Sequence, residues 1–229
     1  MQTNRQNERC RVAVLISGSG SNLQAIIDAV NSSVAANSSA ATDPGYQICA
    51  VISNRPDVKG LERAAKADID RVTLDHKLYP TREAFDEVLA NTLDGYQPDL
   101  IVLAGFMRIL SDGFVKQFKG KLINIHPSLL PKYPGLNTHQ RALDAGDSHA
   151  GCTVHFVSEE LDGGPAIIQA QTNITHCNNA AEIAQQVQVL EHKIYPIAID
   201  WFANDRLKID NNHSFLDNTQ LPASGYVVS

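Results

Sequence analysis

Residues 11–30 read RVAVLISGSGSNLQAIIDAV, and the rest of the fold can be built outward from this stretch. The apolar run over 11–16 predicts a buried strand, and apolar residues at helical spacing over 22–30 predict a helix. The intervening loop, residues 17–22, reads SGSGSN, and its two glycines permit a tight turn. Because the backbone N–H groups at the start of such a helix are unpaired, this loop is a candidate anion site.

The loop differs from a dinucleotide-binding fingerprint in two respects. The third glycine of that pattern would fall at Leu23, and the acidic residue expected after the next strand is replaced by Asn54 and Arg55. The loop therefore suits a single phosphate better than a pyrophosphate. The alternative is a plain strand-to-helix turn capped by Ser and Asn side chains.

Strand and helix patterns alternate through the first half of the chain, which predicts a parallel sheet with right-handed crossovers. We expect an α/β, Rossmann-like, mostly parallel twisted sheet with helices on both faces and antiparallel additions in the C-terminal half. Ligands of such sheets bind beyond the carboxyl ends of the strands. The expected strands are 11–16, 47–53, 70–74, 100–104, 122–125, 152–157 and 166–172, and the expected helices are 22–30, 58–67, 81–93 and 180–202, the last interrupted by Pro196.

The composition limits the function classes. The 19 Lys and Arg against 25 Asp and Glu give a net charge of −6, which argues against a nucleic-acid-binding protein. The four cysteines are widely spaced, which is typical of reduced thiols in a cytosolic protein. The N-terminus is polar and the longest apolar runs are about five residues, against the roughly 20 that span a bilayer. We therefore expect a cytoplasmic protein that does not contact membranes.

We expect one domain over residues 1–229. Residues 11–104 would form a phosphate-binding half and residues 105–210 a catalytic half, followed by a polar tail over 211–229. The Ala-, Ser- and Asn-rich stretch 31–45 is interpreted as a mobile surface loop.

Two further motifs could carry chemistry. In LINIHPSLLP (122–131), Asn124 and His126 alternate in phase, so both side chains project from one face of a strand end. Such an amide and imidazole can donate to a developing oxyanion and move a proton. In EELDGGP (159–165), Asp162 lies in a glycine-rich turn, and it would favour a charged His126 if it came close.

A metal centre is a weaker hypothesis. A ligand set could be assembled from His126, His139, His149, His155 and Asp162, but their spacing matches no tight metal motif. We predict no metal.

Taken together, five segments resemble the phosphoribosylglycinamide formyltransferases, a family of folate-dependent enzymes of purine biosynthesis. The segments are SGSGSNLQAIIDA (17–29), VLAGFMRIL (102–110), NIHPSLLPKYPG (124–135), VHFVSEELDGGP (154–165) and EHKIYP (191–196). The resemblance extends over residues 11–226. It implies formyl transfer from 10-formyltetrahydrofolate, the co-substrate, to the amine of glycinamide ribonucleotide through a tetrahedral intermediate, without a metal, in a monomer or homodimer.

The resemblance also implies roles for particular residues. Asn124 and His126 would stabilise the intermediate, and Asp162 would support His126. The ribonucleotide would contact Gly20, Ser21, Asn22, Gln188 and Glu191. The folate would contact Arg82, Met107, Arg108, Ile109, Leu110 and Asn124.

Three departures from the family pattern are visible: Ser19 replaces a common Asn, Asn137 replaces a histidine of some relatives, and 31–45 resembles an insertion. The alternatives are formyltetrahydrofolate deformylase, methionyl-tRNA formyltransferase and a non-catalytic nucleotide-binding module. The first two would need an additional N-terminal or C-terminal domain, for which we expect no room, and the third is disfavoured by the presence of Asn124, His126 and Asp162.

Overall fold

The strand β1 (Cys10–Ile16) lies inside the sheet of the computed structural model, which describes residues 9–35 and 45–228. Its side chains alternate between two apolar cores. Val12, Val14 and Ile16 join one core, while Ala13 and Leu15 join the other. Burial on both faces explains why the sequence of this strand is almost uninterrupted in its apolar character.

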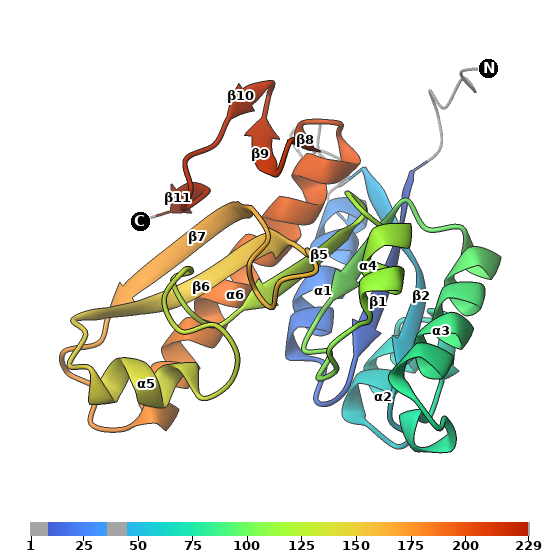
Figure 1. Ribbon diagram of the computed structural model, residues 1–229, viewed down its shortest axis with the longest axis horizontal. Coiled ribbons are helices and arrows are strands. Elements are labelled where there is room, and N and C mark those ends of the chain that lie inside the picture. The colour runs from blue at the N-terminus through green and yellow to red at the C-terminus, as the bar shows by residue number, and fades with distance from the viewer. Residues whose placement is uncertain (1–8, 36–44, 229) are drawn as a thin grey trace.

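The main sheet has eight strands in the order β11-β7-β6-β5-β4-β1-β2-β3 (Figure 1). The strands from β3 to β5 are parallel, β6 is antiparallel to both of its neighbours, and β11 is parallel to β7. The predicted fold class is therefore confirmed, including the antiparallel additions. The remaining strands of this sheet are β2 (Tyr46–Ser53), β3 (Arg71–Thr73), β4 (Leu100–Leu103), β5 (Leu122–His126), β6 (His149–Phe156), β7 (Ala166–Asn173) and β11 (Tyr226–Val228).

Helices cover both faces of this sheet. The first core, on the Val12 face, receives side chains from α1 (Ser21–Ala35), α2 (Lys59–Lys66), α5 (Thr138–Asp144) and α6 (Ala180–Ala203). The second core receives side chains from α3 (Arg82–Tyr96) and α4 (Asp112–Gln117). Within the described ranges, no helix is long and apolar enough to cross a membrane.

Two smaller features lie outside the main sheet and its covering helices. A short 3-10 helix, η1 (His76–Leu78), follows β3, and an antiparallel three-stranded sheet follows α6. Its strands are β8 (Leu207–Asp210), β9 (His213–Leu216) and β10 (Thr219–Gln220). The polar tail thus contributes β9 and β10 to this small sheet and β11 to the edge of the main one.

Two sequence predictions need correction. α1 runs to Ala35, so residues 31–35 are helical and only the remainder of 31–45 can be a loop; residues 36–44 lie outside the described residues.

Pro196 does not interrupt α6, which is one helix over Ala180–Ala203. Proline removes one helical hydrogen bond. Buried side chains on both sides of Pro196, Tyr195 and Ala198 among them, hold the two halves on the sheet despite this loss.

Two glycines bring α2 against the loop after β1. The backbone N–H of Gly60 donates to the carbonyl of Gly18 at 3.1 Å. Gly20 has a φ of +70°, and a Cβ there would lie 2.7 Å from the Cα of Gly60. Such close approach of two backbones is possible only without side chains. The start of α2 therefore packs against the glycine loop and fixes its backbone conformation.

We predict that Gly60→Ala lowers the free energy of unfolding by about 1–3 kcal/mol. The new Cβ would lie 2.4 Å from Cδ1 of the buried Ile16 and 3.2 Å from the carbonyl oxygen of Gly18. Urea denaturation measures the change. Gly95→Ala is the matched control, because a Cβ at this position in α3 meets nothing within 4 Å. The control should be neutral or stabilising by about 0.5–1 kcal/mol, and equal stability of both variants would refute the packing argument.

Candidate active site

The loops that follow β1, β2 and β4 meet where the strand order reverses. Ser17 donates its hydroxyl to Oδ1 of Asn54 at 2.5 Å and accepts the backbone N–H of Met107 at 2.8 Å. Ser17 and Asn54 are both buried. The reversal between β1 and β4 is the position at which open α/β sheets bind ligands. The predicted phosphate loop and the predicted folate segment are thus tied together at this position.

The first turn of α1 and the middle of α6 form the second part of the site. Gln188 donates to the hydroxyl of Ser21 at 3.1 Å, and Nδ2 of Asn22 donates to Oε2 of Glu191 at 2.9 Å. These contacts join residues that are 167 and 169 positions apart in the sequence. All the residues predicted to contact the ribonucleotide, from Gly20 to Glu191, therefore lie around one helix start.

The charges around this helix start are of both signs. The first N–H groups of α1 precede its first i→i−4 bond, from Gln24 to Gly20, and are unpaired within the helix. Arg63 adds a cation, because its guanidinium donates to the carbonyl of Ser19 at 2.9 Å and to Oε1 of Gln24 at 3.0 Å. Burial raises the pKa of Glu191, an effect that the hydrogen bond from Asn22 opposes. The site can accept an anion beside a carboxyl group that resists ionisation.

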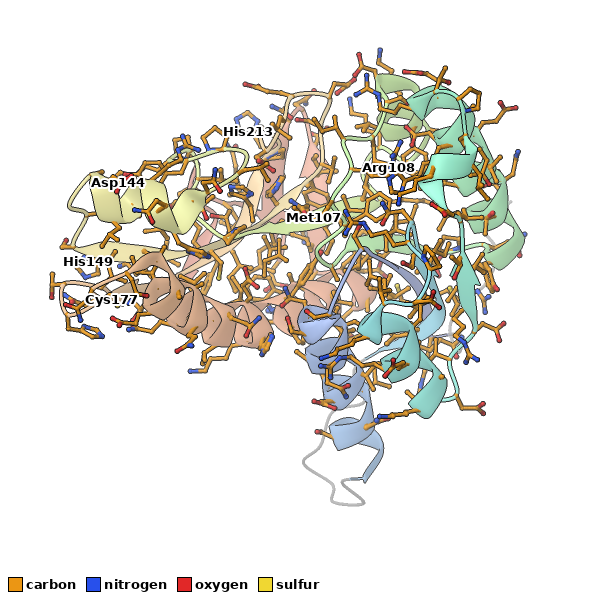
Figure 2. The ribbon with its side chains drawn as sticks, turned by 90° about the horizontal axis from the view of Figure 1, so that it is seen from below. Met107, Arg108, Asp144, His149, Cys177 and His213 are labelled. Carbon is orange, nitrogen blue, oxygen red and sulfur yellow. The ribbon has the colours of Figure 1, made fainter. Side chains whose placement is uncertain are left out.

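The segment after β4 presents apolar side chains to solvent. Met107 and Ile109 are 62% and 60% exposed, whereas Leu110 is only 8% exposed and packs in the second core. Figure 2 shows Met107 near the middle of the molecule and Arg108 on the side of α3. The Arg108 guanidinium lies 4.5 Å from the centre of the Phe85 ring. An exposed apolar strip beside a cation suits a flat ring system that carries an acidic group.

Arg108 and Arg82 both lie near the start of α3. Nε of Arg108 is buried and has no hydrogen-bond partner among the described residues. Arg82, three positions before Phe85 on the helix, is exposed and lies 3.5 Å from the carboxylate of Glu83. Residues three apart share a helix face. Both arginines predicted to contact the folate are therefore on the same side of the site.

The predicted catalytic side chains come together at the carboxyl end of β5. Nε2 of His126 donates to the carbonyl of Tyr133 at 2.9 Å, and a carbonyl can only accept, so Nε2 carries a proton. Nδ1 of His126 lies 3.4 Å from Oδ2 of Asp162. That oxygen also accepts the backbone N–H of Gly135 at 2.8 Å. The turn that carries Asp162 does reach His126, which the sequence left open.

The turn that carries Asp162 has a constrained backbone. Asp162 has a φ of +53°. A Cβ at Gly164 would lie 1.8 Å from the carbonyl oxygen of Phe156, so only glycine fits. The GGP sequence therefore lets the turn fold back over the end of β6, and this brings Asp162 to His126.

The loop after β5 is held by buried polar groups on the antiparallel strands. Thr153 donates its hydroxyl to the carbonyl of Ser128 at 2.7 Å and accepts the N–H of Leu130 at 3.1 Å. Gln169 donates to the carbonyl of Leu130 at 2.7 Å and to Thr153 at 3.0 Å. These bonds fix the backbone that follows His126.

The sequence did not indicate that His155 contacts Asn124. His155 was considered only as a metal ligand, but it pairs directly with Asn124 across β5 and β6. Its Nε2 is 3.2 Å from Nδ2 of Asn124 and 3.8 Å from Oδ1 of Asp162. Burial lowers the pKa of His155 to about 4. The antiparallel register would have identified it, but the sequence does not reveal the register.

His149, which belonged to the weighed ligand set, does not join this cluster. Figure 2 places His149 at the far end of the molecule, where it is exposed. Across residues 9–35 and 45–228, the structure contains no group of three or more His, Cys, Asp or Glu side chains that could hold a metal ion.

Asn137, which replaces a histidine of some relatives, precedes α5 with a φ of +58°. Asparagine tolerates this left-handed conformation better than most residues, which gives it a backbone role.

An Asn–His–Asp cluster beside a glycine loop at the edge of an α/β sheet fits a group-transfer enzyme. Residues 10–199 match the sequence model of the formyl transferases. A phosphoribosylglycinamide formyltransferase of Escherichia coli is 50% identical over 215 residues, which cover 94% of this chain and 97% of that relative. A Haemophilus influenzae enzyme of the same name is 45% identical over 216 residues, covering 94% and 98%. The solved structure of a Coxiella burnetii phosphoribosylglycinamide formyltransferase superposes with a TM-score of 0.89 at 47% identity, covering 97% of this chain and 100% of that chain.

This chain therefore belongs to the phosphoribosylglycinamide formyltransferase family. The likeness extends over both the parallel and the antiparallel parts of the sheet, because the matched coverage exceeds nine-tenths of the chain.

We predict that Glu191→Gln raises the free energy of unfolding at pH 7.5. The folded state holds the Glu191 proton more tightly than the unfolded state does, because burial raises its pKa. This carboxyl therefore stabilises the fold at low pH, and that contribution is lost as the pH rises through the folded pKa. The advantage of the glutamine variant should shrink as the pH falls toward 5.

Denaturant titrations between pH 5 and pH 8 measure this difference. Glu87→Gln on the exposed part of α3 is the matched control and should stay within about 0.5 kcal/mol of the wild type throughout. A glutamine variant at position 191 that is less stable than the wild type at pH 7.5 would contradict the prediction.

Proposed function

We propose that this chain transfers the formyl group of 10-formyltetrahydrofolate to the amine of glycinamide ribonucleotide in purine biosynthesis. The close relatives bear the name of this activity, and the model of formyl transferases covers most of the chain. The observation that supports it best within the structure is the approach of Asp162 to His126, at 3.4 Å, on the strand that also carries Asn124.

The ribonucleotide phosphate would bind at the start of α1. The backbone N–H groups of Gly20, Ser21 and Asn22 supply the donors, and the helix dipole favours the anion. Gln188 already contacts Ser21 and would approach the same ligand. Glu191 would face the amine end of the ribonucleotide, where an acceptor can orient an N–H group.

The folate would lie along the segment after β4. Met107 and Ile109 offer exposed apolar surface, and Arg82 and Arg108 offer positive charge for an acidic tail. The partnerless Nε of Arg108 fits a ligand that supplies an acceptor. Leu110 would contribute mainly through its backbone, because its side chain lies in the core. When bound, this co-substrate supplies an activated formyl group.

The catalytic residues would act on the oxygen of that formyl group. Negative charge develops there as the amine attacks, and donors fixed in advance stabilise it. Nε2 of His126 is engaged by Tyr133, so the proton on Nδ1 is the one that can serve the oxygen. Asp162, 3.4 Å from the same nitrogen, would favour the doubly protonated ring. It would also organise a water that passes a proton from the attacking amine to N10 of the folate, as the bond between N10 and the formyl carbon breaks. Asn124 would supply the second donor.

Several features stay predictions: the cytoplasmic location, the monomeric or homodimeric state, and the single domain with its phosphate-binding half, catalytic half and tail. They concern the location and the assembly of the protein and not the chemistry of the site.

The reaction is tested with 10-formyl-5,8-dideazafolate, whose absorbance changes on loss of the formyl group. We expect turnover only when glycinamide ribonucleotide is present. Equal turnover without the ribonucleotide would favour formyltetrahydrofolate deformylase activity, and no turnover in either mixture would favour a binding module.

We predict that His126→Ala lowers kcat about 10²–10³-fold, the usual cost of removing one oxyanion donor. The KM for glycinamide ribonucleotide should stay within a few-fold, because its phosphate site lies on α1. Steady-state kinetics with the dideazafolate measure both constants.

His149→Ala is the control for this variant, since His149 is exposed and hydrogen bonds to the neighbouring Ser148. The control should keep the wild-type kcat. Near-normal turnover of His126→Ala would remove His126 from the mechanism.

A further inference from the structure

We infer that His155 is a positioning residue, which holds the side-chain amide of Asn124 so that its NH2 group, and not its carbonyl, faces the reacting formyl oxygen. This inference rests on the proposed formyl transfer. It adds to that proposal a residue that touches neither substrate and acts through Asn124.

The register of the sheet places the two side chains together. Asn124 on β5 is paired with His155 on β6, and the next pair on this face is His126 with Thr153. Side chains opposite one another in an antiparallel pair are close enough to interact directly. Nδ2 of Asn124 and Nε2 of His155 are 3.2 Å apart.

The tautomer of His155 follows from its other nitrogen. Nδ1 lies 2.9 Å from the carbonyl of Phe156, which can only accept, so Nδ1 must carry a proton. In the neutral ring, Nε2 then has a lone pair and accepts. An acceptor at this point requires the NH2 group of Asn124 to face it, since the amide oxygen would be repelled.

The surroundings of His155 keep the ring neutral. The residue is only 2% exposed, and burial disfavours its charged form. The groups that face it are His126 on β5, whose charge opposes a second charge, and Asp162 on the turn after β6, whose charge favours one. Burial outweighs the favourable contributions of Asp162 and the Phe156 carbonyl, and the pKa of His155 falls to about 4.

Asp162 is not an equal partner of Nε2. Its Oδ1 lies 3.8 Å away, beyond hydrogen-bond distance, while its Oδ2 is bonded to Gly135 and faces His126. His155 and Asp162 therefore serve different catalytic groups. Asp162 supports His126, and His155 orients Asn124.

The orientation matters because an amide has one donating and one accepting end. With one hydrogen of the NH2 group given to His155, the second hydrogen is left for the formyl oxygen as negative charge develops. A flipped amide would present its own oxygen to that charge, which would turn a stabilising contact into a repulsive one.

The first test compares two variants of His155 by steady-state kinetics. His155→Gln can place a carbonyl oxygen near the former Nε2 and keep the acceptor, whereas His155→Asn is shorter and keeps only the donor to Phe156. We expect kcat to fall at least about 10-fold in His155→Asn, up to the roughly 10²–10³-fold cost of a lost oxyanion donor. His155→Gln should retain most of the activity, and the KM values of both should stay within a few-fold.

A double variant tests whether His155 acts through Asn124. In an Asn124→Ala background, His155→Asn should change kcat by less than about two-fold, because the group that it orients is gone. A full additional loss, or equal losses in His155→Asn and His155→Gln, would overturn the inference.

A measurement on the wild-type protein that depends on no catalytic activity decides the tautomer of His155 directly. Nitrogen-15 NMR of histidine-labelled protein should show His155 as the neutral Nδ1–H tautomer at pH 7.5, with the signal assigned from its absence in the His155→Gln spectrum. A protonated Nε2 would overturn the inference. If the wild type transfers no formyl group, the proposed function fails while the NMR result still decides the state of His155.

Discussion

β5 pairs in parallel with β4 on one side and antiparallel with β6 on the other, so the sheet changes direction beside Asn124 and His126. The parallel part directs its carboxyl ends to one edge, where the glycine loop and the segment after β4 lie. The antiparallel part returns the chain along β5 and places a second set of polar side chains opposite the first. His155 faces Asn124, and Thr153 faces His126. The candidate catalytic cluster depends on this change of direction.

The ligands proposed for this edge are anionic, whereas the chain carries a net charge of −6. Local groups would attract these ligands despite the net charge. The start of α1 and the side chains of Arg63, Arg82 and Arg108 would act on a bound anion over a few ångströms, whereas salt screens the field of the net charge within about 10 Å. Glu191 acts in the opposite sense. A buried carboxyl with a raised pKa costs stability at neutral pH, and its presence beside the glycine loop fits the proposed role in ligand binding.

The sequence predicted best the strands that are buried on both faces of the sheet. β1 and β4 read as apolar runs because both of their faces are covered. Predictions failed where tertiary packing overrode local signals. Pro196 remains inside α6 because neighbouring side chains are buried on the sheet. α1 continues to Ala35 through a polar segment in which Ser32 bonds to the carbonyl of Asp28. α4 and α5 were not predicted, since helices of six and seven residues have too little periodicity.

By itself, the sequence determined the fold class, the glycine loop, and the chemical types of Asn124, His126 and Asp162. Periodicity and local spacing carry this information, because they depend on neighbours a few positions away. The tertiary structure decided which distant groups meet: Asp162 with His126, Asn22 with Glu191, and His155 with Asn124. It also decided the protonation of His155, since burial and strand register are properties of the packed sheet. The sequence places a histidine at position 155, but only the packed surroundings make its ring a neutral hydrogen-bond acceptor.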